Sequence, residues 1–307
     1  MSFYYKGNGA YCYSSSVSML LSVIGEDISP SLVEVTTGFS LGASLERNNM
    51  LFFDNGLSSP DKGVNLAFRT LGFSVVEQAS SMDEEMPIER LKCDLEVSPV
   101  MLGPLDMGHL TYLPNHQFLG GCDHYVLVVE LRDNEVLIHD PAGYPYVWLS
   151  VEQLEKAWKA ENIPWSSGAY RYWKTPKRRG FPSDDEIYDQ SIQLYKDAYE
   201  KQRIQPKFGG EAILLKAKQL LDSQISNEEK GHLTHFAFPL GSRRAIDFSH
   251  FFKERNGLLS SLKEEQAKLF GKCYTCAASQ KWIDVAASLH LLADTEFKFE
   301  ETLLNEM

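Results

Sequence analysis

Cys12 stands where the sequence predicts the start of a helix. Two glycines precede it, and the apolar residues that follow have the i, i+3, i+4, i+7 spacing of an amphipathic helix: Val17, Leu20, Leu21 and Ile24. The amide groups and the positive dipole end at a helix N-terminus stabilise a thiolate. Cys12 is therefore the candidate nucleophile, although a free cysteine is also a common core residue.

A histidine and an aspartate flank the strongest hairpin signal in the chain. His124 precedes an apolar run at residues 125–131, turn-forming residues follow at 132–134, and Asp140 ends a second apolar run. Folding the chain about Asp133 places His124 and Asp140 on neighbouring strands, within hydrogen-bonding reach. An imidazole that takes a thiol proton, oriented by a carboxylate, activates a cysteine. His139 points to the other sheet face and is interpreted as structural.

Two further residues are candidates for substrate contact. His116 lies in the loop ahead of His124, although loop histidines are mostly only solvated. Arg244, beside Arg243, is either a partner in an interdomain salt bridge or a site for an anionic carrier such as a phosphopantetheine arm. The Cys273–Cys276 spacing has no second pair, so we expect no metal site there and no cofactor.

The elements around these residues predict an α+β protein with two domains. Mixed helix and strand patterns fill the first half, including a loop at residues 38–63 that is a candidate part of a substrate cleft. The second half reads as helices at residues 184–203, 209–223, 242–255 and 260–292. A polar, basic stretch separates the halves, so we place the domains at residues 1–178 and 179–307.

The charge is uneven along the chain. The whole protein has a net charge of -12, and residues 1–150 alone, with 7 Lys/Arg and 19 Asp/Glu, account for all of it. This acidity excludes a nucleic-acid partner and either serves solubility or favours a cationic partner. No apolar run reaches the length of about 20 residues that a membrane span needs, and no signal-peptide pattern is found. Five unevenly spaced cysteines fit a reducing compartment, so we expect a cytoplasmic protein.

Several short motifs carry a resemblance. Residues 9–15 (GAYCYSS), 123–129 (DHYVLVV) and 136–141 (VLIHDP) resemble the papain-like, C39-type cysteine peptidase fold. Residues 113–116 (LPNH) resemble the N-terminal domain of the butirosin biosynthesis H family, and residues 241–252 (GSRRAIDFSHFF) resemble its helical C-terminal domain. The resemblance implies a papain-like domain, a helical domain and acyl transfer in antibiotic biosynthesis, from a carrier-protein thioester to an aminoglycoside amine.

The expected function is thus a cysteine-dependent acyltransferase. Cys12 takes an acyl group from a carrier-protein or CoA thioester, His124 moves the proton, Asp140 orients His124, and a small cationic amine accepts the acyl group. Lys6 replaces the glutamine that papain-type enzymes use for the oxyanion, so the Asn8 side chain is the candidate donor beside the Cys12 amide. The alternatives are a cysteine peptidase or amidase using the same triad, and a non-catalytic scaffold.

Overall fold

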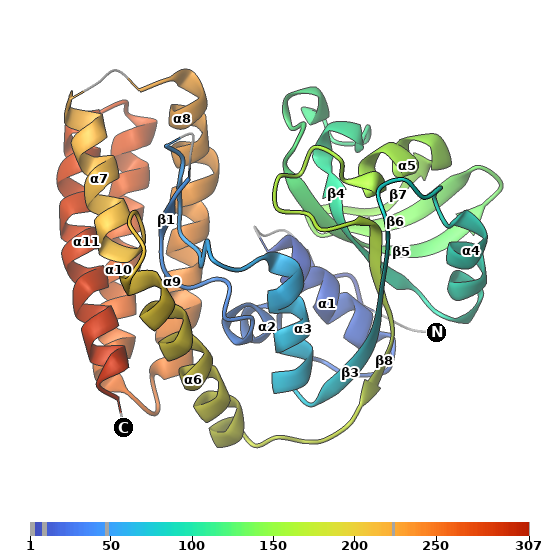
Figure 1. Ribbon diagram of the computed structural model, residues 1–307, viewed down its shortest axis with the longest axis horizontal. Coiled ribbons are helices and arrows are strands. Elements are labelled where there is room, and N and C mark those ends of the chain that lie inside the picture. The colour runs from blue at the N-terminus through green and yellow to red at the C-terminus, as the bar shows by residue number, and fades with distance from the viewer. Residues whose placement is uncertain (1–3, 8–10, 47–48, 223–224, 307) are drawn as a thin grey trace. The chain divides into compact units, whose positions relative to one another are not determined.

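The computed structural model of this protein describes residues 4–7, 11–46, 49–222 and 225–306. The chain divides into two compact units (Figure 1). Each unit has its own hydrophobic core. The first unit comprises Met1–Val33 and Leu71–Phe181, and the second comprises Glu34–Thr70 and Pro182–Met307. Helix α2 (Pro30–Thr36) carries the chain from the first unit into the second. The fold is α+β, as the sequence predicts.

A six-stranded antiparallel sheet forms the centre of the first unit, in the order β3-β8-β4-β5-β6-β7. Strands β4 to β7 follow one another along the chain and form a meander, whereas β8 returns to pair with both β3 and β4. The strands are β3 (Phe73–Ser80), β4 (Val100–Asp106), β5 (Asp123–Arg132), β6 (Glu135–Asp140), β7 (Tyr144–Ser150) and β8 (Ala169–Arg178).

Helices cover both faces of this sheet because β5 is apolar on both sides. The ring of Tyr125 lies 5.9 Å from that of Tyr13 in α1, whereas the adjacent Val126 shares a core with Trp158 in α5. Successive side chains of a strand point to opposite faces, so α1 and α5 lie on opposite sides. The helices of this unit are α1 (Cys12–Ser22), α4 (Ile88–Val97) and α5 (Val151–Lys159).

The hairpin expected from the sequence is formed by β5 and β6. Asp133 adopts a positive φ of 49° in the turn, a conformation that aspartate tolerates better than most residues. Leu127 lies opposite His139 and Val128 opposite Ile138, a register that buries the apolar residues of both strands. The hairpin therefore brings the start of β5 close to the end of β6.

The second unit is mainly helical. Its helices are α3 (Pro60–Thr70), α6 (Asp184–Arg203), α7 (Gly209–Asp222), α8 (Asn227–His232), α9 (Phe238–Phe252), α10 (Gly257–Ala278) and α11 (Trp282–Leu304). The single helix expected at residues 260–292 is two helices. Gln280 has a positive φ of 56°, and the Lys281 amide donates to the Cys276 carbonyl at 2.9 Å, a pattern that ends a helix.

Residues 34–70 belong to the second unit, which differs from the expected division at residues 1–178 and 179–307. Strands β1 (Ser44–Leu45) and β2 (Leu51–Phe52) form a hairpin whose apolar side chains share a core with α7, α9, α10 and α11. Most of the described residues between 38 and 63 are buried, and the helical unit's core includes Ala43, Leu45, Leu51 and Phe53 from this segment.

This division also changes the distribution of charge. The first unit holds 11 Lys/Arg and 18 Asp/Glu, a net charge of -7, and the second holds 19 and 24, a net charge of -5. The asymmetry between residues 1–150 and 151–307 thus largely disappears when each segment is assigned to its unit. The unit that carries Cys12 is nevertheless acidic.

Candidate active site

Cys12 is the first residue of α1, as the sequence predicts. Its side chain is half-buried, and the Ser15 amide donates to the Tyr11 carbonyl at 2.9 Å in the first helical hydrogen bond. The positive end of the helix dipole therefore lies at the thiol, where it favours a thiolate.

His124 and Asp140 meet across the β5-β6 hairpin. His124 Nε2 donates to Asp140 Oδ1 at 2.7 Å, and the two side chains are only 6% and 0% exposed. The side chain of Cys12 also hydrogen-bonds to the His124 ring. Because Nε2 serves Asp140, Nδ1 is the ring nitrogen that faces Cys12. The structure thus brings the three expected residues together in the first unit.

The charges of His124 and Asp140 stabilise each other. Burial by itself would lower the pKa of His124, but the Asp140 carboxylate and then Cys12 outweigh burial and raise this pKa to about 10. Burial would likewise raise the pKa of Asp140, but its hydrogen bonds and the charge on His124 hold that pKa below the usual range. At neutral pH the pair is therefore an imidazolium and a carboxylate, so a thiolate on Cys12 would lie beside a positive charge.

Three further groups surround Asp140, and the sequence analysis identified none of them. Tyr112 Oη donates to Oδ2 at 2.7 Å, the Ala142 amide donates to Oδ1 at 2.6 Å, and Tyr5 Oη donates to the main-chain carbonyl at 2.7 Å. Tyr112 and Tyr5 are distant from Asp140 in the sequence, and no local pattern marks them. Only the paths of the loop and of the N-terminal segment bring them to Asp140.

His139 is buried away from solvent beside aromatic rings. Its ring centroid lies 5.6 Å from that of Tyr5 and 4.3 Å from that of Tyr146. Burial lowers the pKa of His139, which favours a neutral ring. These contacts agree with the structural role that strand alternation predicts.

His116 lies in the loop between β4 and β5, where its Nδ1 donates to the Gly108 carbonyl at 2.9 Å. This hydrogen bond gives the ring a role in loop conformation. Asn8, the expected oxyanion donor, lies outside the described residues. Lys6 bonds to Asp27 at 2.6 Å and to the Ile28 carbonyl at 3.2 Å.

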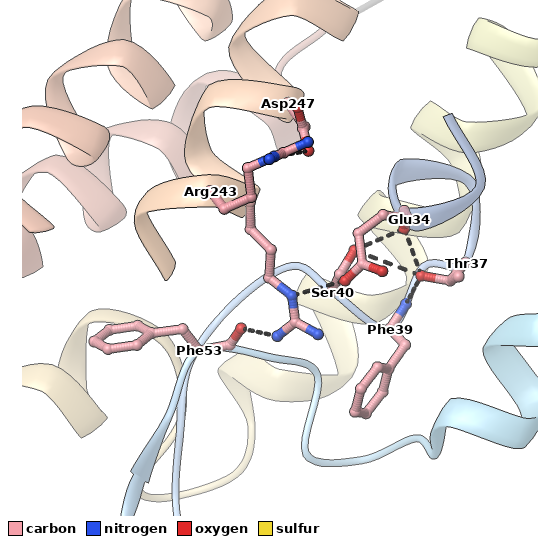
Figure 2. Close-up of polar contacts among 8 residues, drawn as sticks. Glu34, Thr37, Phe39, Ser40, Phe53, Arg243 and Asp247 are labelled. Carbon is pink, nitrogen blue, oxygen red and sulfur yellow. Dashed lines mark hydrogen bonds and ion pairs between the residues drawn. The ribbon is translucent and has the colours of Figure 1, made fainter. Parts of the chain in front are cut away.

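Arg244 takes part in a buried network of the second unit. Its Nε donates to Glu34 Oε1 at 2.8 Å and its Nη1 donates to the Phe53 carbonyl at 2.7 Å. Figure 2 shows that the Glu34 carbonyl also accepts hydrogen bonds from the Thr37 and Ser40 hydroxyls. The arginine and glutamate side chains are 6% and 0% exposed. The guanidinium of Arg244 thus donates to acceptors inside the protein. This arrangement gives no support to a role of Arg244 in binding an anionic carrier.

Neither a metal cluster nor a membrane helix is found in the part of the chain that the structure describes. No three His, Cys, Asp or Glu side chains there are placed to hold a metal ion. Cys273 is fully buried in the helical core, and burial raises the pKa of its thiol to about 12. None of the described helices is long and apolar enough to cross a bilayer.

Comparison with known proteins gives two matches. Residues 204–304 match a family model described as the YobF C-terminal domain. A Bacillus subtilis (strain 168) protein, named "Uncharacterized protein YobF", is 44% identical over 304 residues, which cover 98% of each chain.

These matches correct the resemblance to the butirosin biosynthesis H family, which is wrong. The family model that matches residues 204–304 and the relative that matches nearly the whole chain both carry the name YobF. The motifs that carry that resemblance are short. They consist mainly of residue types that occur at any helix start or in any hairpin. At 44% identity over nearly its whole length, the chain belongs to the YobF family.

Proposed function

We propose that this protein is a cysteine-dependent acyltransferase that works through an acyl-Cys12 intermediate. One observation carries the proposal: the half-buried Cys12 at a helix N-terminus hydrogen-bonds to His124, which in turn donates to Asp140 at 2.7 Å. A nucleophile, a proton carrier and an orienting carboxylate in this order are the requirements for covalent acyl chemistry.

The architecture of the first unit supports a papain-like fold as part of this proposal. The helix that begins with the cysteine packs against an antiparallel sheet, and adjacent strands of that sheet supply the histidine and the aspartate. An unrelated fold can carry the same three residues, so the support comes from the combination of helix, sheet and chain order.

The acylation step follows from the charged state of the site. The Cys12 thiolate attacks the carbonyl carbon of a thioester, and the π electrons move to the carbonyl oxygen. We expect the Cys12 amide, at the N-terminus of α1, to stabilise this oxyanion. When the tetrahedral intermediate collapses, the carbon–sulfur bond of the donor breaks, and the departing thiolate takes the proton from His124. The products are acyl-Cys12, a free donor thiol and a neutral His124.

Deacylation reverses these roles. An amine attacks the acyl carbon, neutral His124 takes the amine proton, and the Cys12 thiolate leaves, which restores the imidazolium. Asp140 stabilises His124 in its charged state and holds its ring orientation. The net charge of -7 on the first unit favours a small cationic amine as the acceptor, with an acyl carrier protein or CoA thioester as donor.

Intact-mass spectrometry tests the acylation step. We expect a panel of acyl-CoA and acyl-carrier thioesters to include a donor that adds one acyl mass to the wild-type protein. Peptide mapping should place the adduct on Cys12, and the Cys12→Ala variant, incubated in parallel, should remain unmodified. An adduct on another cysteine, or equal labelling of Cys12→Ala, would refute the assignment. No adduct from any donor would favour the scaffold alternative.

The fate of the acyl group distinguishes a transferase from a hydrolase. With spermidine as a cationic acceptor, transfer should fall as ionic strength rises, whereas attack by neutral water should respond little. Both products are measured by mass spectrometry across a salt series. If hydrolysis dominates at every salt concentration and with every amine offered, the peptidase or amidase alternative replaces the transferase.

A further inference from the structure

The carboxylate of Asp140 is buried completely, so each of its oxygens needs a donor. Oδ1 accepts from His124 Nε2 and from the Ala142 amide, at 2.7 and 2.6 Å. Oδ2 accepts from Tyr112 Oη at 2.7 Å. Donors on both oxygens fix the rotation of the carboxylate about its terminal bond, and this rotation sets the direction in which Oδ1 faces His124.

The loop that carries Tyr112 is held at its base by a buried side chain. Asp106, at the end of β4, is 1% exposed, and its Oδ1 accepts from the Gly108 and Gly121 amides at 2.9 and 3.0 Å. Its Oδ2 accepts from Asn162 Nδ2 at 3.2 Å. One carboxylate thereby joins the two ends of the segment that contains Tyr112.

Tyr112 is also held from both sides along the chain. Leu110 and Leu113 are 0% and 5% exposed and belong to the core of the first unit. Burial and the adjacent carboxylate raise the pKa of Tyr112 well above its usual range, so its hydroxyl remains a donor at physiological pH. The loop therefore presents a donor of fixed position and constant protonation to Asp140.

We propose that Tyr112 is a positioning residue of this site, which holds the Asp140 carboxylate in the orientation that His124 requires. The role rests on the proposed function, because it matters for catalysis only if Cys12 and His124 act as described. Tyr112 does not touch the reacting atoms. It acts through Asp140, and Asp106 acts in turn by holding the loop of Tyr112 closed.

The pH dependence of the thiolate reports this role. The charged or titratable groups around Asp140 are His124 from β5, Tyr112 from the loop, Tyr5 at the main-chain carbonyl and Tyr144 from β7, whose ring lies 6.0 Å from that of Tyr112. Loss of the Tyr112 hydroxyl removes a donor that favours the carboxylate, so Asp140 becomes protonated at a higher pH. A protonated Asp140 no longer stabilises the His124 imidazolium, through which Cys12 keeps its thiolate.

The experiment measures iodoacetamide alkylation of the full-length protein from pH 4 to 9, with peptide mass spectrometry to separate Cys12 from the exposed Cys93. Tyr112→Phe removes only the hydroxyl, and Tyr144→Phe is the matched control on the neighbouring ring. We expect the acid limb of Cys12 alkylation to move up by about one pH unit in Tyr112→Phe, which lowers the rate about tenfold on that limb. In Tyr144→Phe the Cys12 profile should match the wild type.

The outcomes separate this role from the proposed function. If wild-type Cys12 and Cys93 show the same profile, the thiolate–imidazolium pair does not exist, and the proposed function fails along with the role of Tyr112. If wild-type Cys12 is distinct and Tyr112→Phe keeps its profile, only the role of Tyr112 is overturned. A lower melting temperature with an unchanged profile would also overturn it, because a merely structural tyrosine gives that result.

Discussion

Replacement of Asp140 by asparagine separates charge from shape at the candidate site. The asparagine keeps nearly the same size and one carbonyl oxygen, but it removes the negative charge that outweighs burial at His124. That charge is the main reason that the pKa of His124 rises from 6.5 to about 10. In Asp140→Asn only Cys12 still opposes burial, so we expect the pKa of His124 to fall and its imidazole to be mostly neutral at pH 7.

The magnitude follows from the loss of the imidazolium. A cysteine without a neighbouring cation has a pKa of about 8.5, so only about 3% is thiolate at pH 7, which alone slows alkylation about 30-fold. A more basic thiolate is also more nucleophilic, which recovers a few-fold of the rate. We therefore expect Cys12 in Asp140→Asn to react about tenfold more slowly than in the wild type at pH 7, with similar rates at pH 10.

The assay is iodoacetamide labelling at a series of pH values, read at Cys12 by peptide mass spectrometry and normalised to Cys93. Glu26→Gln is the control, since it removes a carboxylate of the same unit that pairs with Arg178 rather than His124. Circular dichroism confirms that both variants are folded. A folded Asp140→Asn whose Cys12 reacts at the wild-type rate at pH 7 would refute the ion-pair reasoning.

Three other predictions concern stability and reactivity. The folded pKa of His124 is raised to about 10, so its ion pair with Asp140 stabilises the protein fully below pH 6.5 and loses this effect as the pH rises towards 10. The free energy of unfolding should fall over this range by at most about 5 kcal/mol. Urea unfolding across this range should show the decline in the wild type and a flatter dependence in Asp140→Asn. Arg244→Met leaves the carboxylate of Glu34 buried without its ion-pair partner, so the free energy of unfolding should fall by about 3 kcal/mol. Urea titration at pH 7 measures this change, and an unchanged unfolding midpoint would contradict the prediction. Cys273 should resist iodoacetamide until the protein unfolds, because it is fully buried and its pKa is raised to about 12; labelling in native buffer at the rate of Cys93 would show that the helical core opens.

The sequence was most informative where contacts are local. The start of α1 at Cys12 follows from glycines and an apolar repeat within a dozen residues, and the β5-β6 hairpin follows from two apolar runs and a turn. A hairpin of this length places His124 near Asp140 because backbone pairing leaves little freedom between its strands. Helix α6 has the bounds that the helical pattern predicts, residues 184–203, and the structure shows a capping box of Ser183 and Glu186 at its start.

The pattern of apolar residues did not show where α10 ends and α11 begins. The apolar repeat continues past residue 280, so periodicity alone predicted one helix where the chain reverses between α10 and α11. The positive φ of Gln280 depends on the packing of these two helices against each other and not on a preferred turn residue. The tertiary structure decided this turn.

Contacts between distant segments were decided only by the tertiary structure. Residues 34–70 join the helical unit because their apolar side chains find partners more than a hundred residues later, and Glu34 finds Arg244 in the same way. Tyr112 reaches Asp140 because Asp106 closes a loop whose path no periodic pattern describes. Hydrophobic burial is non-directional, so a sequence shows which residues must be buried without showing which distant partners bury them. For this protein, the sequence predicted the start of α1 at Cys12 and the hairpin that joins His124 to Asp140, and the tertiary structure determined what holds these residues in place.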